Sequence, residues 1–490
     1  MAEKKITENT EQKEKVMTKY DLKMQKKKEK EEQQKKEDRK SMIMSIIVVL
    51  VLAAVVASFP LRTYLATHET YVTIAGEDIN RVEFDLNYNL AKTNYENQWG
   101  SYMSMFGYDG TVDPATQMYS ETLTWKDFFE QQAVEQMKQN VAMMQEAKAA
   151  GFEYDTTEEY AKLEEDLNKA AAASGVSEKD FIKAQYGSYA TLDRISEYLK
   201  ETMYLNAYYE KVVKEKTPSM EKIQELYAAD PALYDSVDYR MTMVMANFET
   251  EATEDQIAKA MDEAKAEAEA ADASTGELME GGRWTALSAT VREWLFDDAR
   301  KTGDTTVIED ASNYCYYAIQ FEDRYLNEEP TVDARILISG IVDGEAVLEE
   351  WKNAGATEEA FAELCDKHSE DTMVEGGLYE ALMNTSMDET LSAWLFDDSR
   401  AEGDTVSLKA ADGYTYVMYY IGTNDPEWVL DAKQSELSTI MSDYLTEIKS
   451  DITVEDPNGK LNYLKVEAAQ AELTAAESNA AESTAAEATE

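Results

Sequence analysis

The chain has 490 residues, a formal net charge of −51 and a mean hydropathy of −0.53. Residues 1–40 carry 14 Lys and Arg against 10 Asp and Glu, so the remainder carries −55 (−51 minus +4). A body this acidic repels nucleic acid, which excludes a nucleic-acid-binding function.

An uncharged apolar stretch, MIMSIIVVLVLAAVVASF, occupies residues 42–59. As a helix it would span about 27 Å, close to the thickness of the hydrocarbon core of a bilayer. By the positive-inside rule we expect the basic segment 1–41 in the cytoplasm and the bulk of the chain outside the cell membrane. A cleavable signal peptide is the competing interpretation, but the basic segment and the apolar run are both long for one. We therefore predict a single-pass, uncleaved transmembrane anchor.

The region 70–230 has apolar residues at three- and four-residue spacing between helix-capping and glycine stop signals. A short strand signal, YVTI, precedes it. We predict an all-helical domain over 70–230.

Two similar blocks follow, at 237–327 and 331–424. Each reads as strand, helix, Gly-Gly turn, helix, glycine and two strands. WLFDDARKTGDT in the first block is nearly repeated as WLFDDSRAEGDT in the second, one hundred positions later. We interpret the blocks as two copies of one α+β domain.

A further helix is predicted over 427–450, and an Ala/Glu/Ser/Thr-rich tail over 466–490 is expected to be disordered. The predicted fold class is therefore α+β multidomain: a transmembrane helix, a helical domain, two tandem α+β domains and a C-terminal helix.

Cysteine and histidine are the residues that most often bind metal ions, and cysteines also form disulfides. The chain contains only two of each: Cys315, Cys365, His68 and His368. Two thiols do not make a disulfide framework, so we favour small buried residues over a bridge or a redox role. No spacing suits a zinc site and no calcium-loop pattern occurs. We expect neither a metal nor a cofactor.

The α+β blocks resemble parvulin-type (PpiC-type) peptidyl-prolyl isomerase domains. In the second block, FAELCDKHSEDTMVEGGLYEAL is similar to the family's segment around its Ser-x-Asp and Gly-Gly. The stretches VTIAGEDINRVEFDLNYNL and GVSEKDFIKAQYG resemble the N-terminal domain of SurA- and PrsA-type extracytoplasmic foldases. The resemblance implies that the helix 427–450 packs back on the helical domain, and that the chain is able to form a homodimer.

The resemblance also implies a site. Met387, Leu391 and Phe396 match the family's apolar proline pocket, and Asp371 matches its Asp or Cys beside the twisting bond. An alternative is that the three apolar residues only line the core face of a helix and that the aspartate caps a loop.

The family's two histidines are replaced, by Arg335 on the first strand and Thr415 on the last, and the first block has Arg240 and Cys315 at the places assigned to them. The two residues are candidate catalytic positions, and Arg335 could donate hydrogen bonds to the substrate, although an arginine cannot act as a neutral imidazole does. A surface charge on an edge strand is the alternative for Arg335. We therefore predict a chaperone for unfolded or newly secreted polypeptides in which isomerase activity is left open. An active prolyl isomerase and a non-enzymatic acidic surface scaffold are the alternatives.

Overall fold

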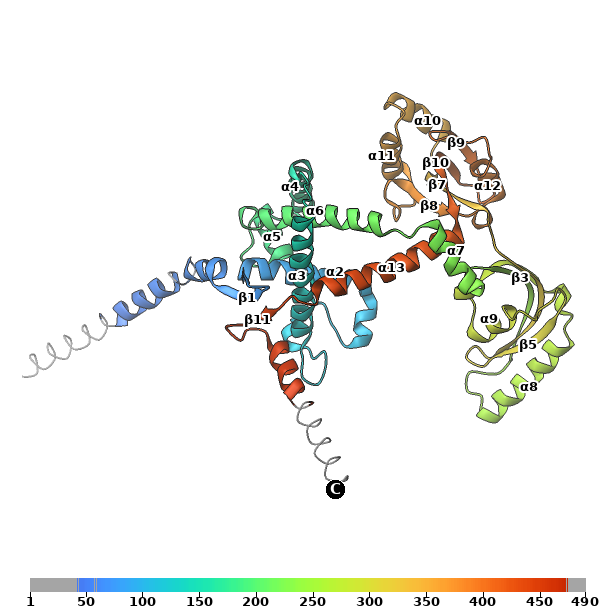
Figure 1. Ribbon diagram of the computed structural model, residues 1–490, viewed down its shortest axis with the longest axis horizontal. Coiled ribbons are helices and arrows are strands. Elements are labelled where there is room, and N and C mark those ends of the chain that lie inside the picture. Colours follow the sequence, from blue (N-terminus) through green and yellow to red (C-terminus); the bar gives the residue numbers. More distant parts are fainter. Residues whose placement is uncertain (1–41, 43, 57, 59, 473, 475–490) are drawn as a thin grey trace, which may run out of the picture. The chain divides into compact units, whose positions relative to one another are not determined.

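The structure is a computed structural model that describes residues 42, 44–56, 58, 60–472 and 474. The chain forms two compact units (Figure 1). The first unit is Met1–Glu210 with Leu445–Glu490, and the second is Lys211–Tyr444. The predicted segment 1–41 and most of the predicted tail lie outside the described residues.

One helix in the described part of the chain, Met44–His68, is long and apolar enough to cross a bilayer, with a mean hydropathy of 2.7. It contains nearly all of the predicted span 42–59 and continues past Arg62 without a break in the described residues. Length and composition alone support a membrane-spanning role, and a signal sequence would meet the same criteria. The coarse prediction, an α+β multidomain chain with an apolar N-terminal helix, is confirmed.

A three-stranded sheet of order β11-β1-β2 begins and closes the folded part of the first unit. β1 (Thr70–Ile74) turns into β2 (Glu77–Asn80) through Ala75 and Gly76, which both have positive φ. β11 (Val454–Glu455) pairs with β1 from the far end of the chain. One core cluster joins the two ends, because Leu461 and Tyr463 are buried with Ile74 and Phe84.

Between residues 81 and 216 the first unit contains α2 (Arg81–Trp99), α3 (Trp125–Ala149), α4 (Thr157–Ala173), α5 (Glu178–Tyr186) and most of α6 (Leu192–Lys216). Local signals explain where two of them begin. The Asn80 side chain accepts hydrogen bonds from the first backbone N–H groups of α2, and Thr124 forms a capping box with Asp127 at the start of α3. Val82, Leu86 and Ile195 then form part of a second helical core.

The second unit contains two four-stranded antiparallel sheets with one strand order. The first sheet, β4-β3-β6-β5, consists of β3 (Ser236–Met245), β4 (Glu277–Arg283), β5 (Thr305–Asp310) and β6 (Cys315–Tyr325). The second sheet, β8-β7-β10-β9, consists of β7 (Pro330–Ser339), β8 (Leu378–Leu382), β9 (Thr405–Lys409) and β10 (Thr415–Pro426).

Helices cover both sheets. On the first sheet these are α8 (Glu254–Ala270) and α9 (Ala289–Leu295), and on the second they are α10 (Gly344–Asn353), α11 (Glu358–His368) and α12 (Glu389–Leu395). One long helix, α8, therefore stands where the second sheet has α10 and α11.

The repeated twelve-residue phrase forms the same structure in both places. It covers the end of α9 or α12 and the turn that follows. Arg300 lies over the ring of Trp294 at 4.8 Å, and Arg400 lies over the ring of Trp394 at 4.9 Å. The repeat thus encodes a helix end that a cation–π contact stabilises against its own turn.

α7 (Met220–Ala229) and α13 (Glu427–Lys449) also belong largely to the second unit. The start of α13 buries Trp428 and Val429 against Ile223 of α7. The predicted helix 427–450 therefore packs on α7, which is the last helix of the predicted helical region 70–230. A later segment, which contains Leu461, packs into the core of the first unit. Residues 462–472 are helical, so the part of the predicted disordered tail that is described is a helix.

Candidate functional site

Alternate residues of β7 face opposite sides of the second sheet. Ala334 and Ile336 are buried with Leu391 and Leu395 of α12, whereas Leu337 is buried under α10 and α11. We call these sides the α12 face and the α10/α11 face. This alternation decides which of the predicted site residues meet.

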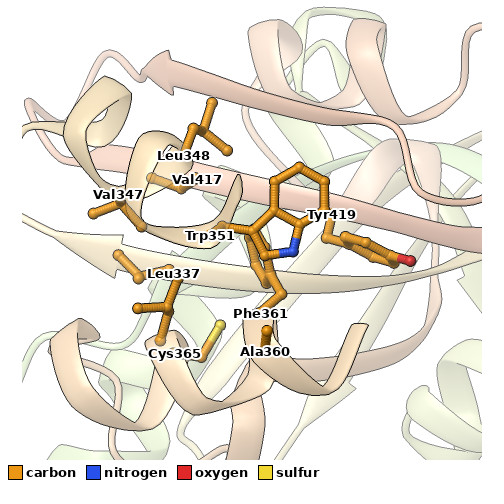
Figure 2. Packing of buried hydrophobic residues seen from close by; sticks show 10 residues of the cluster. Leu337, Val347, Leu348, Trp351, Ala360, Phe361, Cys365, Val417 and Tyr419 are labelled. Carbon is orange, nitrogen blue, oxygen red and sulfur yellow. The ribbon is translucent and has the colours of Figure 1, made fainter. Parts of the chain in front are cut away.

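The α10/α11 face is a filled core (Figure 2). Trp351 of α10 packs edge to face against both Phe361 of α11 and Tyr419 of β10. Cys365 is also buried here, and its burial raises the pKa of the thiol to about 12. Both cysteines are free and buried, so they behave as small core residues.

Arg335 lies on the α10/α11 face. Its Nε is 3.0 Å from Oε1 of Glu358 at the start of α11, and its guanidinium donates to the Gly376 carbonyl oxygen at 2.9 Å. Its register partner is Tyr419, which belongs to the core on this face. The side chain thus ties β7 to α11 and to the Gly-Gly turn, and it does not point into the predicted proline pocket.

Thr415 also lies on the α10/α11 face. It pairs with Ser339 across β7 and β10, two residues from Val417, which is buried on that face. A Cβ at Gly344, the first residue of α10, would lie 2.9 Å from the Thr415 methyl group. The sheet therefore separates the two candidate residues Arg335 and Thr415 from the apolar pocket on the α12 face.

Met387, Leu391 and Phe396 do come together, on the α12 face. Leu391 is 5% exposed and is a core residue, whereas Met387 and Phe396 are half-buried at the edge of the cluster. Leu391 therefore fills the core, whereas Met387 and Phe396 stay partly exposed, and a proline pocket formed by the three remains a prediction.

Asp371 lies beside this surface. Its Oδ2 accepts a 2.6 Å hydrogen bond from the Tyr379 hydroxyl, and its Oδ1 accepts from the backbone N–H of Met373. The hydrogen bond from Tyr379, followed by that from Met373, holds the pKa of Asp371 below its usual range. Tyr379 itself packs into the cluster of the α12 face. Asp371 is thus both a loop cap and one half of a polar pair next to the apolar surface.

A second polar pair on this face was not predicted. The hydroxyl of Tyr416 donates to Oδ2 of Asp412 at 2.8 Å, and Tyr416 packs in the same cluster as Tyr379. Burial is the largest cause that raises the pKa of Tyr416 to about 12. The signal in the sequence was the alternation of Tyr416, Met418 and Tyr420 on the last strand, which marks one face.

The first sheet repeats part of this arrangement. Arg240 pairs with Glu322 and donates to the Gly276 carbonyl oxygen, as Arg335 does with its own partners. Tyr317 donates to Asp310 as Tyr416 does to its aspartate. The first sheet therefore keeps the structural arginine as well as one Tyr–Asp pair.

The register of the strands changes one predicted correspondence between the two sheets and shows that the first sheet lacks one of the two Tyr–Asp pairs. Thr415 lies opposite Lys409, and its counterpart opposite Glu309 is Tyr316, so the predicted correspondence with Cys315 is off by one residue. The hairpin of the second sheet is one residue shorter, which produces the offset. Met279 occupies the strand position of Tyr379, so the first sheet lacks that Tyr–Asp pair.

Large apolar side chains stay exposed on or near both sheets of the second unit. On the first sheet, Met243 and Met245 follow Met241 on the same side of β3, and each is 55% exposed. Near the second sheet, Ile341 is 90% and Met373 is 91% exposed. Isolated apolar residues are common on surfaces, but a row of methionines on one sheet face is typical of adaptable binding surfaces.

Within the described residues, no group of three or more His, Cys, Asp or Glu side chains is arranged to hold a metal ion. His368 instead lies 3.2 Å from a carboxylate oxygen of Glu350.

No family profile and no curated protein matches the chain. Solved structures do. The foldase PrsA of Streptococcus pneumoniae is 16% identical, with 66% of this chain and 78% of that chain covered and a TM-score of 0.16. The peptidylprolyl isomerase PrsA of Bacillus cereus is 12% identical, with 82% and 99% covered and a TM-score of 0.18. A SurA-like chaperone of Campylobacter jejuni is 16% identical, with 52% and 82% covered and a TM-score of 0.12.

The chain is thus similar to SurA- and PrsA-type foldases.

Proposed function

We propose that the protein is a membrane-anchored extracytoplasmic folding factor that acts mainly as a chaperone, holding unfolded polypeptides on the open faces of its two sheets. The observation that carries the proposal is the pair of exposed methionines Met243 and Met245, which continue a row from the half-buried Met241 on the first sheet. Methionine side chains adapt to many apolar partners, which suits clients without a common sequence.

The charge of the α+β domains indicates which clients bind. Residues 236–327 contain 20 Asp and Glu against 8 Lys and Arg, and residues 330–426 contain 21 against 5. Acidic segments are repelled by such surfaces, and apolar segments that carry Lys or Arg are attracted to them.

The site of action follows from the apolar helix. Met44–His68 is long enough to cross a bilayer, and the basic segment 1–40 before it favours retention on the cytoplasmic side. The second unit would then act outside the membrane. The homodimer remains a prediction, and an acidic surface scaffold that binds no client remains the alternative.

A prolyl isomerase is the second candidate, because a specific contact favours it. Twisting an X-Pro bond requires an apolar site for the ring and polar groups near the amide, since no covalent bond breaks. The half-buried Met387 and Phe396 offer the first, and the Tyr379–Asp371 pair offers the second. Arg335 and Thr415 have no part in this version of the site.

A light-scattering assay of client aggregation tests the chaperone proposal. The full chain in lipid nanodiscs should suppress aggregation of a reduced, unfolded client. The double variant Met243→Ser, Met245→Ser should require several-fold more protein for the same suppression. The matched control Val176→Ser, Met220→Ser removes apolar side chains of similar exposure, 46% and 43%, from the loop between α4 and α5 and from the start of α7. Equal suppression by both variants would rule out the methionine row as the binding surface.

A proline-limited refolding assay tests the second candidate. Acceleration by the wild-type chain that disappears in Asp371→Ala and in Phe396→Ala supports an isomerase. Leu391→Ala is a poor probe, because a leucine that is 5% exposed is part of the core. An unchanged refolding rate with the wild-type chain excludes the isomerase and leaves the chaperone.

A further inference from the structure

A small cavity lies where the apolar helix joins the folded part of the first unit. Its volume is about 200 Å³. Two apolar residues of the helix line it together with six polar or aromatic ones: Arg62, Glu69, Tyr71, Arg81, Tyr189 and Lys460. The three basic residues come from the apolar helix, the start of α2 and the segment after β11, so only the folded unit brings them together.

The cavity is basic in a chain that is strongly acidic. Its lining holds three cations and one carboxylate, Glu69, which lies 3.4 Å from Nζ of Lys460. Asp85 lies outside the lining and accepts from Nε of Arg81 at 2.5 Å. A guanidinium carries four further N–H donors. The net charge of the lining is therefore +2 in a protein of −51.

One aromatic ring holds two of the cations in place. The Arg81 guanidinium carbon is 4.9 Å from the centre of the Tyr71 ring, and Nζ of Lys460 is 5.1 Å from it. Tyr71 is 5% exposed and packs against Phe84, so it is a fixed platform. Burial is the largest cause that raises the pKa of Tyr71 to about 12, so the phenol stays neutral. Positioned cations lose little entropy when an anion binds.

The cavity lies at the depth of lipid headgroups if the helix spans the bilayer. Eighteen residues separate Met44 from Arg62 along the helix. At 1.5 Å per residue this is about 27 Å, close to the hydrocarbon thickness. Arg62 is the first charged residue after the apolar run. Its side chain therefore meets the layer in which phospholipid phosphates lie.

We propose that this cavity binds the phosphate of an anionic phospholipid headgroup, with Arg62, Arg81 and Lys460 as its cationic ligands. The inference depends on the membrane anchoring in the proposed function. The cavity suits a phosphodiester and the first atoms of its headgroup, since it is smaller than a pocket for a drug-sized ligand. Arginine and lysine around a phosphate are the usual protein ligands for it. A bound headgroup would fix the first unit to the membrane surface.

Native mass spectrometry of the full chain, released from micelles doped with phosphatidylglycerol or phosphatidylcholine, tests the proposal. The wild-type chain should retain phosphatidylglycerol in preference to phosphatidylcholine. The double variant Arg62→Gln, Lys460→Gln should weaken that retention about 25-fold, roughly fivefold for each cation. It leaves the Arg81–Asp85 ion pair intact. The control Lys169→Gln, Lys200→Gln removes the exposed Lys169 and the half-buried Lys200 from the same helical unit and should retain the lipid.

Competition with inorganic phosphate distinguishes the two sources of the anion. Retention that persists in excess phosphate supports a lipid ligand, and complete displacement shows a site for free phosphate and overturns the lipid assignment. Equal retention of the two lipids, or equal loss in the variant and the control, overturns the site altogether.

Two further measurements separate this proposal from the function it depends on. If the wild-type chain sediments with vesicles but shows no lipid preference, only the headgroup site fails. If it does not sediment with vesicles, the anchoring itself is wrong. Aggregation suppression by the double variant should equal that of the wild-type chain, because the cavity is separate from the methionine row.

Discussion

Arg335→Met replaces a guanidinium that links three parts of the second sheet's domain with an apolar chain of similar length. In the wild-type protein this side chain is 17% exposed and joins β7 to Glu358 and to the Gly376 carbonyl oxygen. Because it faces the filled α10/α11 core, we expect the substitution to lower stability and to leave any activity of the folded protein unchanged.

The contacts set the size of the effect. A hydrogen bond from a charged donor contributes about 1.5–3 kcal/mol. Glu358 is 34% exposed and stays partly hydrated after the substitution, so the ion pair adds less than about 1 kcal/mol. We expect a loss of about 3 kcal/mol, which lowers the Tm of a domain of this size by roughly 12–24 °C.

Differential scanning calorimetry resolves the unfolding transition of each domain in the full chain. Arg240→Met is the matched control, because that arginine pairs with Glu322 and the Gly276 carbonyl oxygen on the first sheet. It should shift a different transition. Refolding and aggregation assays are then run well below both transitions.

Two results would refute the reasoning. A stable Arg335→Met protein that has lost refolding activity would place the arginine in a catalytic site. A loss of activity that Arg335→Lys restores without restoring stability would do the same, since a lysine supplies the charge but not the paired contacts.

Three further outcomes are expected. Leu461→Ala removes a fully buried side chain and should destabilise the first unit by about 2–5 kcal/mol, seen as faster limited proteolysis between α2 and α6. An unchanged cleavage rate would show that the segment after β11, which contains Leu461, does not stabilise the first unit. Glu83→Gln tests a carboxyl whose pKa burial raises to about 7. Since the folded state holds that proton more tightly, wild-type stability should fall by about 3 kcal/mol as pH rises from about 4.5 to 7, and the variant should lack this slope in denaturant titrations. A parallel pH profile for the two proteins would contradict the assignment. In Tyr379→Phe, NMR titration should show the pKa of Asp371 rising towards its ordinary value, because the lost hydrogen bond is the largest cause of its depression. The wild-type advantage in stability should therefore be present at neutral pH and vanish as pH falls through the lowered pKa. An unmoved pKa would identify the Met373 N–H as the sole cause.

The helices and the apolar anchor were predictable because their signals are local. Asn80 and Thr124 cap helices through contacts within three residues, and the spacing of apolar residues marks the buried side. The duplication was predictable because a twelve-residue phrase recurs, and the cation–π contact of Trp294 with Arg300 lies within it.

The arrangement of the candidate site was not predictable in the same way. β7 is buried on both faces, so alternation along ARILI does not say which helix each side chain meets. The face of Arg335 depends on where α11 returns to the sheet, a contact across 23 residues. The pairing of β11 with β1 could not be predicted, because a strand of two residues is too short to show an alternation of apolar and polar residues.

That pairing has a consequence for biogenesis. Ile74 is synthesised about 380 residues before its partner Val454, so the part of the protein that leaves the ribosome first is the last to be completed. Both sheets of the second unit form from strands that are close in the sequence, so they can fold during synthesis. The core of the first unit is completed only when the segment with Leu461 and Tyr463 has been made, and until then Ile74 and Phe84 lack these packing partners. A protein built in this order is itself incompletely folded for most of its own synthesis.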